Sequence, residues 1–327
     1  MTATLAPSPT MVPPVEALPQ VLPSERLTAS GKAIPELRVE LRKIDDLRNV
    51  GSVVLTWAQA LGTIAVAAWV AHPVGYVAAA LLMGSAFARF AIISHEAAHK
   101  LLFTNKRAND LVGRWLLGAP AFVPLETYRR GHFAHHKDEF GPEEPDMNLY
   151  VGYPISRASL RRKLVRDAVG ISGWKNLKPL FGALKSPTAR PFAARILGAQ
   201  VVLLVAFTAV GRPELYLGLW FLPWMTSWRV INRLRSIAEH GGMQRSGDRR
   251  QTTHHVEQHW IARFLIVPLN TGWHLAHHVD MGVPWRNLPR LHRELAAAGY
   301  ITPTLTYPNY RALWRVLSAR DSALAST

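Results

Sequence analysis

The sequence predicts an all-α integral membrane protein with four transmembrane helices in two hairpins and a helical cytoplasmic cap that carries a di-metal histidine site. Two observations support this prediction: long apolar segments occur in two pairs, and nine histidines occur in four clusters outside them. The 327 residues are 49% hydrophobic, include 11 tryptophans and carry a formal net charge of +16. Soluble proteins seldom combine these properties.

Each apolar segment is close to the length of about 20 residues that a helix needs to cross a bilayer core. Turn-forming sequences join the members of each pair, HPVG at 72–75 and GRPE at 211–214. Buried core helices of a large soluble protein are the alternative, but the lengths and the tryptophan-rich ends favour spans. The predicted spans are about 52–71, 74–94, 192–211 and 215–231.

Charge predicts the orientation of these spans. Lys and Arg are concentrated in 38–48, 100–190 and 233–320, while each hairpin turn carries at most one. The positive-inside rule therefore places both termini, the central loop and every histidine cluster in the cytoplasm, and we expect a multi-pass protein of a bacterial inner membrane. Arginines near the cytoplasmic ends of the spans are expected to snorkel to the headgroups. They are Arg89, Arg195 and Arg229.

Three regions are predicted along the chain. Residues 1–49 form a Pro/Ala-rich region, disordered over 1–35, that leads to a basic pre-membrane segment and lacks the features of a signal peptide. Residues 50–315 form the membrane domain, and 316–327 form a C-terminal tail. Within the domain, 111–125 is apolar but contains two prolines and an arginine, so it is either an interfacial or re-entrant segment or an ordinary helix of the cap.

The histidine spacing predicts two metal ions. Residues four apart share one helix face, so each such pair can direct two imidazoles at one ion. Adjacent histidines diverge by roughly 100° around a helix and can serve two ions lying side by side. Imidazole suits iron, zinc, copper and nickel, and the absence of cysteine excludes thiolate zinc sites and iron–sulfur clusters. The nine candidate ligands are His95, His99, His132, His135, His136, His240, His274, His277 and His278.

One cluster permits a different interpretation. The sequence HEAAH at 95–99 matches the H-E-x-x-H signature of zinc hydrolases, in which Glu96 would be the general base. A membrane zinc protease is therefore a hypothesis from another class. It leaves the two H-x-x-H-H clusters at 132–136 and 274–278 without a role, which favours the dinuclear site.

The clusters resemble the three histidine boxes of the membrane fatty acid desaturase and hydroxylase superfamily. The resemblance covers roughly 50–315, with HEAAHK at 95–100, HFAHH at 132–136 and NTGWHLAHH at 270–278 as the boxes, and AEHG at 238–241 supplying the additional histidine. The segment VPWRNLPRLH at 283–292 is also similar to the one that follows the third box in bacterial members. Ala276 departs from the family pattern where many relatives carry an acidic residue, and Ser236 where acyl-coenzyme A desaturases use asparagine.

The resemblance implies a non-haem di-iron enzyme with two iron ions and O2 as co-substrate. Other groups should orient the imidazoles, because a metal-bound histidine usually donates its second N–H to a carboxylate or carbonyl. His254, His255 and His259 match no box and are expected at the surface or behind the ligands. The candidates for orienting groups are Glu96, Glu239, Asp138, Glu144, Asp146, Asn270 and Asp280.

The predicted activity is the introduction of a double bond into a fatty-acyl or related lipid chain. A hydroxylase or ketolase acting on a lipid, carotenoid or alkane is the alternative on the same scaffold. Electrons should come from a separate donor such as a ferredoxin with its reductase, which the basic cytoplasmic surface could dock. No nucleic-acid-binding module is recognisable, so nucleic acid is not an expected partner.

Overall fold

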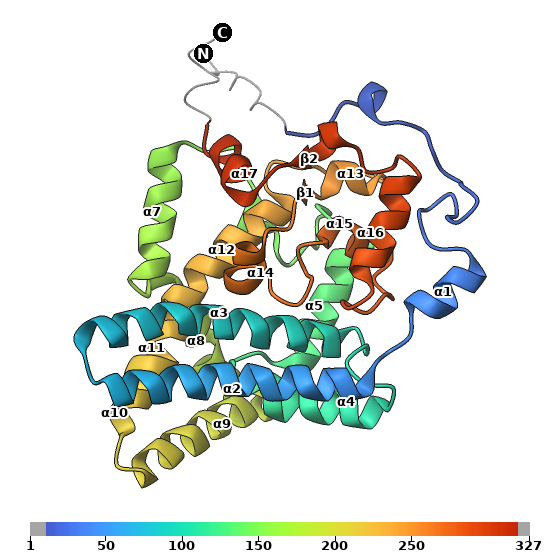
Figure 1. The fold of residues 1–327 in the computed structure, drawn as a ribbon. Helices are drawn as coiled ribbons and strands as arrows, with labels where there is room; N and C mark the ends of the chain where they lie inside the picture. Colours follow the sequence, from blue (N-terminus) through green and yellow to red (C-terminus); the bar gives the residue numbers. More distant parts are fainter. Residues whose placement is uncertain (1–10, 320–327) are drawn as a thin grey trace.

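A computed structural model describes residues 11–319, which are predominantly helical. Figure 1 shows two layers: long helices lie along one side of the molecule, and shorter helices form a cap on the other. The long-helix layer contains α2 (Asp46–Val70), α3 (Pro73–Ala98), α4 (Lys106–Val112), a π-helical turn at Gly113–Gly118, α9 (Arg190–Ala209), α10 (Pro213–Leu215), a second π-helical turn at Tyr216–Phe221 and α11 (Leu222–Met225).

The cap contains the histidine-bearing helices and the elements around them. Its two strands, β1 (His255–Val256) and β2 (Thr306–Tyr307), pair in parallel. Its helices are α5 (Leu125–Lys137), α6 (Met147–Tyr150), α7 (Arg157–Ala168), α12 (Ser227–His240), α13 (Arg249–Thr252), α14 (Trp260–Leu265), α15 (His274–Val279), α16 (Leu288–Ala297), a 3-10 turn at Pro303–Leu305 and α17 (Tyr310–Leu317). Helix α8 (Ile171–Ala183) connects the two layers.

Three helical stretches of the described residues are long and apolar enough to cross a membrane: Pro35–Val70, Pro73–Ala98 and Arg190–Ala209. They contain the first three predicted spans except for one residue at the end of the first and two at the end of the third. Large apolar side chains on α2 and α9 point outward, including Trp69, which is 85% exposed, and Val202, which is 68% exposed. Helix α3 lies between α2 and the cap (Figure 1). It is more buried than α2 or α9.

The fourth predicted span, 215–231, is not one continuous helix. Pro223 has no N–H to donate, and a π-helical turn precedes it. At Thr226 the backbone leaves the helical region, with φ −123° and ψ −87°, before α12 begins. The prediction of one uninterrupted helix here is wrong, because proline and the local turn redirect the chain into the cap.

The predicted disorder over 1–35 is wrong for 11–34, while 1–10 lie outside the described residues. A 3-10 turn at Val15–Ala17 and a bridge between Leu27 and Ala33 precede α1 (Pro35–Leu41). Leu27 is 1% exposed and packs in a hydrophobic cluster with α15 and α16. A segment without periodicity is thus ordered by its contacts with the cap. At the other end, α17 continues to the buried Leu317, beyond the predicted boundary at 315, and 320–327 are not described.

The segment 111–125 combines the end of α4, a π-helical turn and a non-helical stretch. Its free carbonyl groups accept hydrogen bonds from three side chains: Gln200 Nε2 donates to Ala119, Trp220 Nε1 to Pro120 and Trp224 Nε1 to Ala121. Irregular backbone among apolar helices is tolerated where the protein supplies such partners. The segment therefore is not an ordinary cap helix, and it brings α5 against the end of α3 on the cap side (Figure 1).

Candidate metal centre

The structure brings all nine predicted histidines together, and their ring nitrogens form two adjacent groups. The first, here the five-imidazole group, has ligand atoms within 4.8 Å of one another and contains His95, His99, His132, His136 and His277. In the second, the four-imidazole group, His274 Nε2 lies 3.0 Å from the Nε2 atoms of both His240 and His278. It contains His135, His240, His274 and His278.

Helix ends position these side chains. His95 lies in the last turn of α3 and His99 is its C-terminal cap; α5 carries the second cluster, His240 ends α12, and α15 begins at His274. Each adjacent pair divides between the groups as helix geometry predicts. His136 and His277 join the first group, with their Nε2 atoms 2.9 Å apart, while His135 and His278 join the second.

In three of the histidines, Nδ1 faces away from the other imidazoles and forms a hydrogen bond, which determines whether the inward-facing Nε2 carries a hydrogen atom or a lone pair. Nδ1 of His135 lies 2.9 Å from Glu144, Nδ1 of His278 lies 2.5 Å from Glu139, and Nδ1 of His240 lies 2.9 Å from the carbonyl oxygen of Thr252. A neutral imidazole has one N–H, and these acceptors take it. The inner Nε2 atoms of the three rings therefore present lone pairs to one another, which suits a cation between them.

The environment keeps most of these imidazoles neutral. Burial, followed by the neighbouring histidines, lowers the pKa of His274, His277 and His278 well below its usual value. His135 differs: burial is the largest single effect and opposes its charged form, but the hydrogen bond to Glu144 and the negative charges of Glu144, Asp146 and Glu139 together raise its pKa. Neutral histidine is the form that binds a metal.

Three of the predicted orienting groups lie beside the histidines. Glu144 contacts His135, Glu239 Oε1 lies 3.7 Å from His274 Nδ1, and Asp146 gathers with His135 and Glu144.

The other four predicted groups have different partners. The Glu96 carboxylate accepts a hydrogen bond from the backbone N–H of Trp285, Asp138 pairs with Arg245 at 2.8 Å, Asn270 accepts from Arg263, and Asp280 pairs with Arg42 at 2.8 Å. Within 11–319, none of these four side chains forms a hydrogen bond or ion pair with a histidine of either group.

Glu139 and the Thr252 carbonyl were not among the groups predicted to orient the imidazoles. Glu139 is 3% exposed, contacts His278 and pairs with Arg249. It follows His136 by three residues, so it was as visible in the sequence as Asp138. The turn after α5 directs Glu139 inward and Asp138 outward, which local periodicity does not predict.

The additional histidines separate into buried and exposed positions. His254 is buried and its Nε2 donates to the carbonyl of Gly241, next to His240. His255 is buried and stacks on His292 with ring centroids 4.6 Å apart. His259 is exposed and caps α14. Of the two expected placements, at the surface or behind the ligands, His259 takes the first, and the buried His254, beside the residue that follows His240, takes the second. At the positions that depart from the family pattern, Ser236 Oγ donates to the carbonyl of Asn232, and Ala276 is buried.

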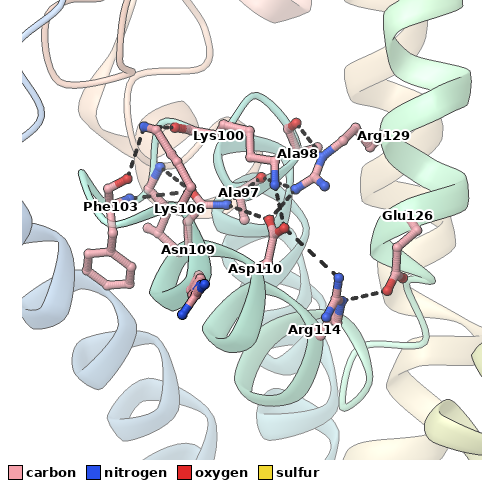
Figure 2. A network of polar contacts seen from close by, with 12 residues as sticks. Ala97, Ala98, Lys100, Phe103, Lys106, Asn109, Asp110, Arg114, Glu126 and Arg129 are labelled. Carbon is pink, nitrogen blue, oxygen red and sulfur yellow. Dashed lines mark hydrogen bonds and ion pairs between the residues drawn. The ribbon is translucent and has the colours of Figure 1, made fainter.

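A polar network fixes the first histidine cluster against the second (Figure 2). Arg129 of α5 donates to the carbonyls of Ala97 and Ala98, both at 2.8 Å, and pairs with Asp110 at 2.7 Å. Lys100 also pairs with Asp110. The last carbonyls of a helix have no intrahelical donor, so the guanidinium supplies what the end of α3 lacks.

A cavity of about 510 Å³ lies beside the two groups. His95, His132, His135, His240, His274 and His277 line one end of it. The ring of Tyr128 stacks on His132 in the same wall, with centroids 5.4 Å apart. The arrangement can place a bound molecule directly against imidazoles of both groups.

A model of the fatty acid desaturase family matches residues 48–317. The chain belongs to the fatty acid desaturase family. The matched region contains every histidine of the two groups, both hairpin regions and almost the whole cap. Family membership confirms the resemblance drawn from the histidine boxes.

Curated desaturases share low identity with this family member. Dihydrorhizobitoxine desaturase of Bradyrhizobium elkanii is 23% identical over 249 residues, covering 69% of this chain and 67% of that protein. The chloroplastic omega-6 fatty acid desaturase of Brassica napus is 25% identical over 292 residues, covering 78% and 61%. The sn-1 oleoyl-lipid 12-desaturase of Arthrospira platensis is 38% identical over 89 residues, 27% of this chain and 23% of that protein. The chain thus spans about three fifths of the plant relative's length.

The donor set of this family member suits iron. Nitrogen donors predominate, no thiolate is present, and carboxylates stand behind the rings. Imidazole ligands whose outer nitrogens are hydrogen-bonded to carboxylates are compatible with non-haem iron. His240 and His278 each use the N–H at Nδ1 for the Thr252 carbonyl and for Glu139. Their Nε2 atoms therefore carry lone pairs and no hydrogen atom, and a bound cation would accept those lone pairs.

Proposed function

We propose that this protein introduces a double bond into a fatty-acyl or related lipid chain, using O2 and a non-haem di-iron site. The observation that carries the proposal is the division of nine inward-facing imidazoles into two adjacent groups on a chain of the desaturase family. The curated relatives named above are all desaturases, which favours desaturation over hydroxylation.

The nine histidines are the proposed ligands of two iron ions, one held by each group. Bound iron would supply, with O2, the oxidising power to break a C–H bond that has no acidic proton for a general base to remove. The residues of the chain do the positioning. Glu139, Glu144 and the Thr252 carbonyl hold the outer N–H groups, so that the inner nitrogens keep one orientation.

The cavity is the proposed site of the lipid chain. Trp224, Trp228 and Phe122 provide aromatic wall surface, and the histidines close the opposite end. Holding a chain here would fix one C–H bond against the metal centre and exclude water from it.

We further propose four membrane spans. Helices α2, α3 and α9 are three of them. The interrupted segment 213–231 is the fourth, with Pro223 buried at the break and Thr226 half-buried. The basic regions outside the hairpin turns support a cytoplasmic cap in a bacterial inner membrane. The proposed domain is 50–315 extended to the end of α17, preceded by the segment packed on the cap.

Electrons are proposed to come from a ferredoxin with its reductase. Reduction of O2 to water takes two electrons beyond the two removed with the hydrogens of the chain, so an external donor is required. The net charge of +16 favours association with an acidic carrier.

Lipid analysis by mass spectrometry tests the proposal. Cells expressing the protein should contain an acyl chain that has lost two hydrogen atoms, and His135→Ala should abolish this product. His259→Asn is the matched control, because His259 is exposed and asparagine retains a helix-capping side chain. A product that gains one oxygen atom would replace desaturation with hydroxylation or ketolation. Equal products in wild type and His135→Ala would overturn the proposed metal centre.

A further inference from the structure

The cavity beside the histidines has a polar wall away from them. Helices α7, α8 and α12 supply this wall. A passage for hydrocarbon alone would need none of these polar groups, and buried polar groups are costly unless they are paired. The polar wall consists of Ser172, Asn176, Arg229, Asn232, Arg233 and Asp167.

One guanidinium of this wall has no carboxylate partner. Arg233 pairs with Asp167, with Nη2 3.0 Å from Oδ1, and Arg235 pairs with Glu239 at 2.9 Å. Arg229 donates from Nε to the carbonyl of Trp224 at 3.0 Å, and its guanidinium stacks on the ring of that tryptophan, 4.1 Å from the centroid. Within 11–319, no carboxylate lies at ion-pair distance from Arg229, and its two terminal nitrogens have no hydrogen-bond acceptor.

The remaining acids of the cavity lie at its histidine end. Asp146 gathers with His135 and Glu144, and Glu96 accepts from the backbone of Trp285. The positive charge of Arg229 is therefore separated along the wall from both carboxylates. Stacking on Trp224 fixes the plane of the guanidinium and leaves its terminal N–H groups free, which is the geometry that binds a carboxylate or phosphate.

Helix α12 sets the distance between this charge and the metal centre. Arg229 lies at the start of the helix and His240 at its end, eleven residues later, which is about 16 Å along the axis at 1.5 Å per residue. A long hydrocarbon chain can span this separation and a short-chain acid cannot. The tryptophans of the wall, Trp224 and Trp228, offer the apolar surface that such a chain would contact.

We infer that Arg229 binds the anionic head group of a long-chain substrate, a carboxylate or a phosphate, and thereby holds a mid-chain carbon at the histidines. This inference rests on the proposed function and names the substrate class of the same site. Arg229 lies at the cavity, so its role differs from that of an arginine that only reaches bilayer headgroups.

Ligand binding without turnover tests this role. The purified protein, loaded with iron in discs of neutral phosphatidylcholine, is titrated with fluorescent cis-parinaric acid and competed with oleate, oleoyl lysophosphatidate or oleyl alcohol. Because a hydrogen bond between charged groups adds to the binding free energy, at least one anionic competitor should bind about tenfold or more tightly than the alcohol. Arg229→Gln should remove this preference and leave the affinity for the alcohol unchanged.

The matched control is Arg190→Gln. Arg190 also donates from Nε to a backbone carbonyl, that of Leu184 at 3.2 Å, and is exposed outside the cavity wall. It should keep the wild-type preference. Arg229→Lys keeps the charge without the planar fork and should retain part of the preference. Iron content and thermal unfolding confirm that each variant is folded.

The competitors and the discs separate the possible outcomes. A preference for oleate alone would show that the head group bound by Arg229 is a carboxylate. A preference for lysophosphatidate alone would show that it is a phosphate. Equal affinity for acids and alcohol in wild type, or a preference that survives Arg229→Gln, overturns the inference. The inference is also overturned if discs of phosphatidylglycerol weaken binding of cis-parinaric acid to the wild type and this effect disappears in Arg229→Gln. That result would show that the arginine binds bilayer lipid. Binding is measured without product formation, so an inactive protein that keeps the preference refutes only the proposed function.

Discussion

Arg129 Nη2 donates a hydrogen bond to the backbone carbonyl of Ala97 at 2.8 Å, one residue before the end of α3 (Figure 2). The contact joins the helix of the second histidine cluster to the helix of the first. Because Asp110 pairs with the same guanidinium, α4 is held in the same junction. The relative positions of His99 and His132, whose Nε2 atoms are 2.8 Å apart, thus depend on a side chain that belongs to neither histidine group.

Arg129→Gln should loosen this junction. The loss of its hydrogen bonds to helix-end carbonyls and to Asp110 should lower the free energy of unfolding by about 2 kcal/mol and reduce bound iron. Metal analysis and thermal unfolding of the purified protein measure both. Arg130→Gln is the matched control, since Arg130 is exposed on the same helix and its side chain contacts only Thr127 among the described residues. Unchanged iron content in Arg129→Gln would show that the junction does not position the ligands.

Glu139→Ala should weaken iron binding by about 10- to 100-fold, because Glu139 accepts from Nδ1 of His278 and partners of metal-bound histidine typically contribute this much. Competition with a chelator measures the affinity. Asp138→Ala is the control: it removes an ion pair, with Arg245, but no contact to a histidine. If the two variants lose iron equally, Glu139 has no specific role in orienting His278.

Leu27→Ala tests the packing of the N-terminal segment. Leu27 is 1% exposed, so truncating it should destabilise the protein by about 3 kcal/mol, the usual size for a buried leucine. Val39→Ala, at a position 68% exposed, should change the melting temperature little. Equal melting temperatures for wild type and Leu27→Ala would mean that 11–34 contribute nothing to the stability of the cap.

His255 should make stability depend on pH. Burial, with a smaller effect of His292, lowers its pKa to about 3, against about 6.5 in the unfolded chain. Below about pH 6.5 the unfolded state binds more protons, so acidification costs stability until the pH passes about 3. His255→Phe keeps an aromatic ring against His292 without titrating, and its melting temperature should fall less between pH 6.5 and 4.

The exposed His259 supplies the comparison for this pH effect. His259→Asn should leave the wild-type slope of melting temperature against pH unchanged, because this side chain is not buried. Parallel slopes for wild type and His255→Phe would contradict the assignment of the acid sensitivity to the buried stack.

Features with a local period were predictable from the sequence. Apolar runs predicted α2, α3 and α9, with ends that differ from the observed ends by one to six residues. The i, i+4 and adjacent spacings predicted how His135 and His136 would diverge. Both are properties of a single helix, whose geometry is the same wherever it lies. The combination of histidine boxes was specific enough to indicate the family.

Contacts between distant segments were decided by the tertiary structure. Asp138 and Glu139 are neighbours with the same charge, and only the turn after α5 determines which one faces His278. Residues 11–34 have no period of their own and are ordered because α15 and α16 offer an apolar surface to Leu27. Sequence by itself determined which helices form and which imidazoles share a face; the packing of those helices decided which groups stand behind the imidazoles, because such partners are set by distance in space and not by separation along the chain.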